Sequence, residues 1–195
     1  MVESISQTMY GDAPLSTAKH PNPDVVDGVL PNAKDAVLIG RTVTINKPRA
    51  ELYSFWRDFK NLPLFMENIE RVDILDDDRS HWVVSAPANK TVEWDSLITE
   101  EIPGEIIAWT SAPDASVNNS GRIEFRDAPA GRGTEVTATI TYEPPCGAVG
   151  KMLAKVFQHE PNIQARRELR RFKQLMETGE ISTAQPPVAA PRGNS

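Results

Sequence analysis

The chain has a single cysteine and no long apolar run, and these two absences exclude whole classes of protein. Cys146 is alone in 195 residues, so no internal disulfide can form, which is typical of a reducing compartment. No apolar run reaches the roughly 20 residues that a membrane-spanning helix needs. The opening sequence MVESISQTMYGDAPL lacks the basic flank and apolar stretch of a secretory signal. We therefore expect a cytoplasmic protein.

Common motifs of metal, phosphate and nucleophile chemistry are also missing. His20, His81 and His159 show no ligand spacing such as HExxH, and no GxSxG occurs. The glycine-containing stretch 128–133 (APAGRG) lies between two predicted strands, which favours a hairpin turn over a phosphate-binding loop. Cys146 precedes an expected helix but has no evident histidine partner, so we favour a structural cysteine over a nucleophile. We expect no metal and no cofactor.

The balance of charge argues against a nucleic-acid partner. Asp and Glu number 27 against 21 Lys and Arg, for a net charge of -6, and an acidic chain repels phosphate backbones and anionic lipid surfaces. The run RRELRRFK (166–173) is basic. It would suit an anionic lipid head or a partner, although a water-facing helix with scattered positive charge is commoner. We expect no stable membrane insertion, and transient docking stays open.

Proline-rich segments at both ends predict one folded domain between two tails. Residues 1–35 and 182–195 mix proline with small and polar residues and show no helical or strand period, so we expect them to be flexible or disordered. The domain then covers residues 36–181. We see no internal repeat.

In the first part of this domain, the spacing of apolar residues predicts a strand followed by two short helices. Apolar residues alternate over 37–45, which predicts a half-buried strand. Asn46 offers a helix cap and Pro48 a first-turn residue. The expected helix has an apolar stripe at helical spacing, formed by Leu52, Phe55, Trp56 and Phe59. Pro63 predicts the start of a second short helix.

Six further strands and a long amphipathic helix are predicted next. The strand segments are RVDIL, HWVVSA, TVEWDSLIT, EIIAWTS, GRIEFRD and TEVTATITY. Alternation assigns one covered face that includes Trp94, Ser96, Trp109, Phe125 and Ile140, and one wet face of charged residues and threonines. The stretch 148–180 has apolar residues at threes and fours, is bent or interrupted at Pro161, and has a stop signal at Gly179.

In this order of elements the chain resembles the START/Bet v 1-like (SRPBCC) superfamily, in its polyketide cyclase/dehydrase and coenzyme Q-binding branch. The phrases that carry the resemblance are VTINKPRAELYSFWRDFKNLPLFM, VEWDSLITEEIPGEIIAWTS, RGTEVTATITYEPPCGAVGKM and ELRRFKQLMETGEI. It implies an α+β helix-grip fold, in which a seven-stranded curved antiparallel sheet wraps around a long C-terminal helix.

The resemblance also implies a cavity between sheet and helix that binds a hydrophobic small molecule. The side chains expected to line it are Trp56, Phe65, Trp94, Trp109, Phe125, Ile140, Tyr142, Met152, Val156 and Phe157. Periodicity alone fits a filled aromatic core equally well, because inward residues of a packed core recur at the same spacing.

Candidate acid and base groups are few. Tyr142, Glu93 and Arg122 are the candidates, with His81 and Asp95 beside them. Glu93, Asp95 and Arg122 alternate onto the wet face, where ordinary cross-strand ion pairs are the simpler interpretation. Three functions stay open. They are a carrier of a lipid, isoprenoid quinone or polyketide-like molecule, an aromatase/cyclase or dehydratase acting in the same cavity, and a stress or interaction protein with a filled core.

Overall fold

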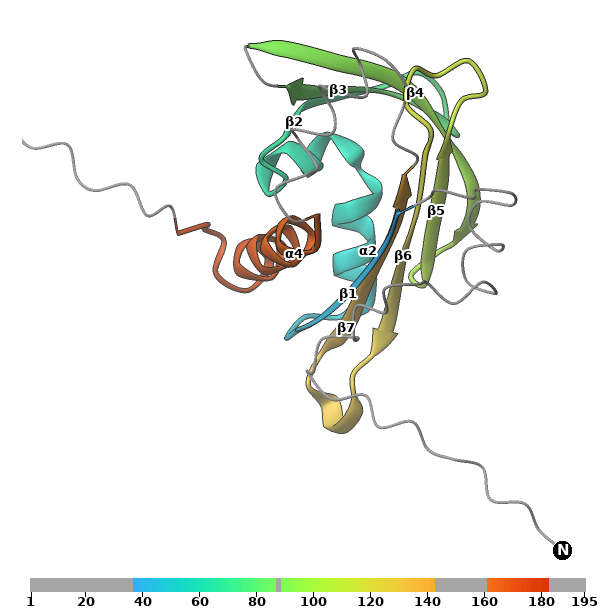
Figure 1. Ribbon diagram of the computed structural model, residues 1–195. Helices are drawn as coiled ribbons and strands as arrows, with labels where there is room; N and C mark the ends of the chain where they lie inside the picture. The colour runs from blue at the N-terminus through green and yellow to red at the C-terminus, as the bar shows by residue number, and fades with distance from the viewer. Residues whose placement is uncertain (1–36, 87–88, 143–160, 183–195) are drawn as a thin grey trace, which may run out of the picture.

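A computed structural model of the protein describes residues 37–86, 89–142 and 161–182. One antiparallel sheet, with strand order β1-β7-β6-β5-β4-β3-β2, curls around the helices (Figure 1). The strands are β1 (Val37–Ile45), β2 (Ile69–Ile74), β3 (Arg79–Ala86), β4 (Lys90–Ile102), β5 (Ile106–Ser111), β6 (Asn119–Asp127) and β7 (Thr134–Tyr142). The helices are α2 (Arg49–Arg57), η1 (Phe59–Leu64), η2 (Pro129–Gly131) and α4 (Pro161–Thr178). The predicted helix-grip fold is confirmed.

The two short helices after β1 differ in detail from the prediction. Pro48, not Asn46, directly precedes α2, with extended backbone angles of φ -61° and ψ 141°. The second helix, η1, is a 3-10 helix that starts at Phe59 and contains Pro63, instead of starting at that proline. Asp58 favours the earlier start, because its side chain accepts a hydrogen bond from the Lys60 amide.

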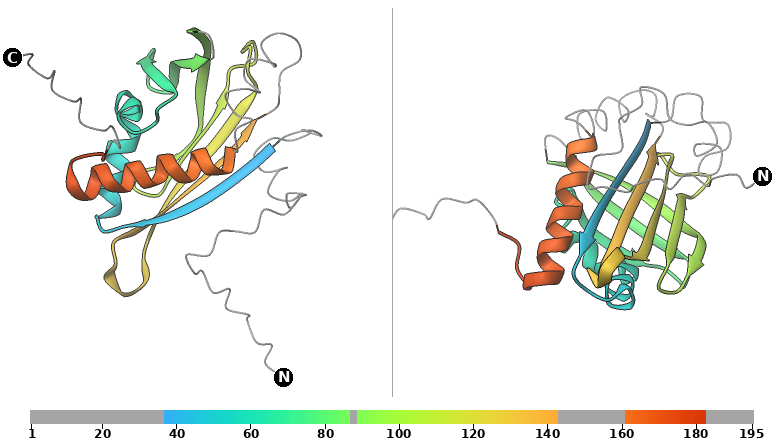
Figure 2. Two further views of the ribbon diagram at one scale, coloured as in Figure 1. Left: turned by 60° about the vertical axis from the view of Figure 1, so that its left-hand side comes forward. Right: turned by 90° about the horizontal axis from the view of Figure 1, so that it is seen from below.

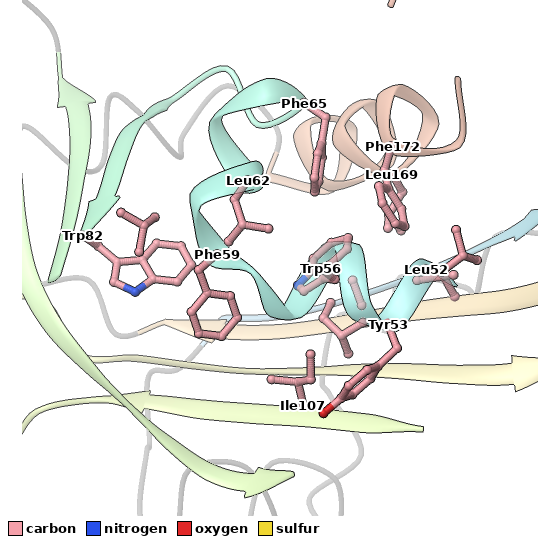
Figure 3. Close-up of a cluster of buried hydrophobic side chains, with 14 of the residues drawn as sticks. Leu52, Tyr53, Trp56, Phe59, Leu62, Phe65, Trp82, Ile107, Leu169 and Phe172 are labelled. Atoms are coloured by element: carbon pink, nitrogen blue, oxygen red, sulfur yellow. The ribbon is translucent and has the colours of Figure 1, made fainter. Parts of the chain in front are cut away.

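The hydrophobic core lies where α2, η1 and α4 meet the inner face of the sheet. Its centre is an aromatic cluster of Trp56, Phe65 and Phe172, in which the Trp56 ring lies 5.1 Å from that of Phe65 and 5.0 Å from that of Phe172 (Figure 3). Phe65 and Phe172 are 4.9 Å apart. These tilted and edge-to-face contacts join α2 and the end of η1 to α4, which follows much later in the sequence.

Helix α4 lies along the edge strand β1 (Figure 2). The Lys173 ammonium donates to the Thr44 carbonyl at 2.6 Å, and the Asn46 amide donates to the Glu177 carboxylate at 2.7 Å. The helix ends as predicted at Gly179, whose φ of +78° suits a residue without a side chain. The predicted segment before Pro161 lies outside the described residues.

The turn between β6 and β7 is the hairpin that the sequence predicts. The Ala128 amide donates to the Gly133 carbonyl at 2.8 Å. Gly133 has a φ of +92°, and an added Cβ would lie 2.1 Å from the Ile45 carbonyl oxygen. Only glycine therefore allows this hairpin to pass so close to the end of β1.

Truncation of the central aromatic ring should reveal how much the core contributes to stability. We expect Phe172→Ala to lower the free energy of unfolding by about 3–5 kcal/mol, because it removes a fully buried ring and leaves a cavity. Arg170→Ala, at an exposed position on the same helix, is the control and should change stability little. Urea unfolding followed by circular dichroism measures both. A loss below about 1 kcal/mol for Phe172→Ala would contradict this packing.

Candidate functional site

A row of small polar side chains crosses the concave face of the sheet. The pairing register places Ser80 opposite Ser96 and Ser96 opposite Ser111. The Asn119 amide then donates to the Ser111 hydroxyl at 3.2 Å. We call Ser80, Ser96, Ser111 and Asn119 the polar row. Its three serines are buried, which is unusual for a polar set on an otherwise apolar inner face.

An apolar row runs beside the polar row and is less well covered than the rest of the core. Ile98 pairs with Trp109, Trp109 with Gly121, and Gly121 with Ile140. The three large side chains Ile98, Trp109 and Ile140 are only partly buried, although they are on the concave face. Ile107, the neighbour of Trp109 on the same face of β5, is completely buried. Coverage by the helices is therefore complete at one end of the sheet and incomplete at the other.

Two stacked tryptophans flank the polar row on its other side. Trp82 and Trp94 pair across β3 and β4, with ring centroids 6.3 Å apart and planes at 14°. The Trp82 indole donates to the Ser80 hydroxyl at 2.9 Å. The Trp94 indole N–H and the Asn119 side-chain amide are buried but have no hydrogen-bond partner among the described residues.

The predicted lining residues divide into four groups. Trp56, Phe65 and Phe125 are 2%, 0% and 1% exposed and belong to the sealed core; Figure 3 shows the first two. Trp94, Trp109 and Ile140 lie beside the polar row. Tyr142 occupies the register position opposite Asn119. The remaining three, Met152, Val156 and Phe157, lie outside the described residues.

The sequence pattern predicts only one residue of the polar row to lie on the inner face. Alternation assigned Ser96 to the covered face, but Ser80, Ser111 and Asn119 were not identified as inner residues. The available signal was a serine two residues from an inward tryptophan, in SHW of β3 and in WTS of β5. Serine is common on exposed strand faces, so this signal is weak without the register between strands.

Two of the predicted acid–base candidates lie in ion pairs on the convex face. Arg122 pairs with Glu100 and Glu124, and Glu93 lies 3.5 Å from the His81 ring. These contacts match the cross-strand pairs expected from alternation. They hold both side chains on the opposite side of the sheet from the polar row.

His81 and Asp95 form the centre of this convex cluster. Their side chains are hydrogen-bonded at 2.7 Å, and Arg79 contacts the same carboxylate at 2.5 Å. The hydrogen bond to Asp95 raises the pKa of His81, and the same bond lowers the pKa of Asp95. Such mutual shifts stabilise the charged pair in the folded chain.

Two carboxylates near the inner helices were not singled out by the sequence. Glu101, which follows an irregularity in β4 between Ile98 and Glu100, accepts hydrogen bonds from Tyr53 at 2.5 Å and Arg57 at 2.8 Å. The Arg57 hydrogen bond lowers the pKa of Glu101. On α4, burial raises the pKa of Glu168 to about 7, although Gln164 donates a hydrogen bond to it at 3.0 Å.

The described ranges hold neither a metal-ligand cluster nor a membrane-spanning helix. Among residues 37–86, 89–142 and 161–182, no three His, Cys, Asp or Glu side chains are grouped so as to hold a metal ion. No helix within the described part of the chain is both long and apolar enough to cross a membrane.

The convex cluster predicts a pH dependence of stability. A histidine pKa raised by folding contributes stability that is complete below the unfolded value, about 6.5, and is lost as the pH rises through the folded value. We therefore expect the stability advantage of the natural chain over His81→Gln to shrink as the pH rises above the unfolded histidine value of about 6.5. Urea unfolding at a series of pH values measures it. An advantage that grows with pH would exclude the protonated pair.

Gly121 predicts how Trp109 is positioned. An added Cβ at Gly121 would lie 2.1 Å from Cζ2 of Trp109, so the indole lies directly over this glycine. We expect Gly121→Ala to lower the free energy of unfolding by about 1–3 kcal/mol, because the indole must move. In a Trp109→Ala background the same substitution should cost little. An equal cost in both backgrounds, measured by urea unfolding, would show that the indole is not the obstacle.

Comparisons with known proteins agree with this architecture. A family model described as polyketide cyclase/dehydrase and lipid transport matches residues 45–170. The crystal structure of DR_A0006 from Deinococcus radiodurans is 42% identical, with a TM-score of 0.61, and the match covers 74% of this chain and all of that one. An uncharacterised 17.2 kDa protein of Streptomyces lincolnensis is 28% identical over 71% of this chain and 89% of its own length.

An enzyme of known class shares the fold. The ZhuI aromatase/cyclase from Streptomyces sp. R1128 has a TM-score of 0.56 at 17% identity, over 75% of this chain and 99% of its own. At that identity the likeness concerns the fold alone. Together with the family model, it confirms the START/Bet v 1-like resemblance noted in the sequence. The match over residues 45–170 spans well over half of the sequence, and the chain therefore belongs to the polyketide cyclase/dehydrase and lipid transport family.

Proposed function

We propose that this protein binds a hydrophobic small molecule, such as a lipid, an isoprenoid quinone or a polyketide-like compound, on the concave face of its sheet. The observation that carries the proposal is the incomplete cover of Ile98, Trp109 and Ile140. Large apolar side chains on the inner face of a curved sheet are normally sealed, as Ile107 and Ile123 are here. The partly covered row is a surface on which an apolar guest would replace water.

The energetics of such a site are favourable without any charged contact. Burial of apolar surface contributes about 25 cal/mol per Å², so a two-ring aromatic or a long alkyl chain gains several times the thermal energy before the costs of association. Trp109 offers a flat aromatic surface for this contact, and its neighbours on β4 and β7 are branched aliphatic residues. A preformed apolar row of this kind is typical of small-molecule sites.

A second candidate is a cyclase or dehydratase acting on the same guest. Glu168 is the observation in its favour, because a carboxyl group with a pKa of about 7 is suited to donate and accept protons near neutral pH. Tyr142 remains a candidate through its position opposite Asn119. Glu93 and Arg122 are held in ion pairs on the convex face, so this candidate does not depend on them. Loss of turnover in Glu168→Gln with retained binding would support it.

Mass spectrometry of gently purified protein is the most direct test of the binding function. We expect a non-covalent apolar molecule to remain with the chain under native conditions and to be released on unfolding. Its mass would distinguish a lipid from a quinone or a polyketide-like compound.

A defined probe gives a quantitative test. We expect ethylnaphthalene to bind in isothermal titration, and Trp109→Ala to weaken its binding about tenfold, because the indole supplies a large part of the contact area. Thr139→Ala, on the convex face, is the matched control and should leave the affinity unchanged. If neither ethylnaphthalene nor any copurified molecule binds, the remaining possibility of a filled core without a guest is favoured.

A further inference from the structure

We propose that the polar row, together with the Trp94 indole, forms a subsite for a neutral hydrogen-bond-accepting oxygen, such as a ketone or quinone carbonyl, on the bound apolar molecule. The inference rests on the binding function proposed above and narrows it to a chemical class. It predicts that guests with a carbonyl group are held in a defined orientation, whereas pure hydrocarbons are held by apolar contact alone.

Two buried N–H groups in this region lack a described hydrogen-bond acceptor. Trp94 and Asn119 each keep a buried side-chain N–H group that has no partner in the described part of the chain. Buried polar groups are almost always hydrogen-bonded in folded proteins, and an unpaired donor destabilises the fold. Donors of this kind favour a ligand that brings an acceptor atom.

The neighbouring Trp82 shows that an indole N–H group on this face can find a protein acceptor. Trp82 stacks on Trp94 and occupies the opposite position on β3, yet its indole N–H donates to the Ser80 hydroxyl at 2.9 Å. The same side chain in nearly the same environment therefore has a hydrogen-bond partner in one strand and none among the described residues in the next.

Two hydroxyl groups of the polar row can add donors, whereas the Ser96 hydroxyl already donates to the Thr110 carbonyl at 3.1 Å. The Ser80 oxygen already accepts from Trp82, and the Ser111 oxygen accepts from the Asn119 backbone amide. Each of these serines keeps its own hydroxyl proton, which can turn toward a guest. None of the four residues carries a charge, so the row suits a neutral carbonyl better than a carboxylate, whose burial would require a cation.

The position of the row matches the shape of such a guest. The polar row lies between the stacked pair Trp82 and Trp94 and the partly covered apolar row of Ile98, Trp109 and Ile140. An apolar body lying on Trp109 would therefore have donors along one flank. A carbonyl attached at the edge of a ring or along a chain is placed there without exposing the apolar body to water.

The test uses two probes of similar size, acetylnaphthalene and ethylnaphthalene, with isothermal titration of the full chain. Ethylnaphthalene is intrinsically the more hydrophobic probe, so the absolute affinities of the two probes are not compared. For each substitution, the fold-change in affinity for one probe is compared with the fold-change for the other. Trp94→Phe keeps an aromatic ring and removes the N–H group. We expect it to weaken acetylnaphthalene roughly fivefold and to leave ethylnaphthalene unchanged. Asn119→Leu should have the same selective effect.

Trp82→Phe is the matched control. It removes an indole whose N–H group is already bound to Ser80, so any effect on affinity should be equal for the two probes. A spectroscopic measurement complements the affinities. The carbonyl stretching band of bound acetylnaphthalene should move to lower wavenumber in the natural chain, as hydrogen bonding requires, and should move back in Trp94→Phe.

The outcomes separate the inference from the function on which it rests. If both probes bind and every substitution affects them equally, with no shift of the carbonyl band, the polar subsite is excluded and the binding function stands. If the natural chain binds neither probe, the binding function and the subsite fail together. If Asn119→Leu does not fold, the comparison of Trp94→Phe with Trp82→Phe decides the result.

Discussion

The structure depends on a mismatch between a strongly curved sheet and the described helices α2, η1 and α4 that pack inside it. The aromatic cluster of Trp56, Phe65 and Phe172 joins α2, η1 and α4 at one end of the concave face and excludes water there. The same helices do not fully cover the inner side chains around Trp109. The packing that maintains the fold and the proposed binding surface thereby lie in different halves of one interior, so that a guest would not disturb the aromatic cluster.

The two faces of the sheet carry different kinds of polar side chain. Long charged side chains pair across strands on the convex face, where water screens them and they contribute modestly. The concave face instead carries short, uncharged groups such as Ser96 and Asn119. A short side chain leaves room for a guest, and an uncharged one avoids the large cost of burying an ion. This division explains why the charged candidates of the sequence lie away from the inner rows.

Much of the fold could be predicted from the sequence, because alternation and turn residues are local signals. All seven strands, the hairpin at 128–133 and the helix end at Gly179 follow from such signals. The site could not be predicted to the same depth. Trp56 and Trp109 look alike in the pattern, yet one is sealed and the other partly open, since that difference depends on which distant elements pack over each indole. The polar row requires the register between four strands, which no single strand encodes.

The contact between α4 and β1 has a consequence for the behaviour of the protein in a crowded solution. An edge strand normally offers free backbone groups to any other extended chain, and this is a common route to fibrils. Here Lys173 and Glu177 occupy the Thr44 carbonyl and the Asn46 amide. An incoming strand would have to displace both side chains before it could add to the sheet. The C-terminal helix thus acts as a guard against self-assembly through this margin, and loosening it would expose the chain to aggregation.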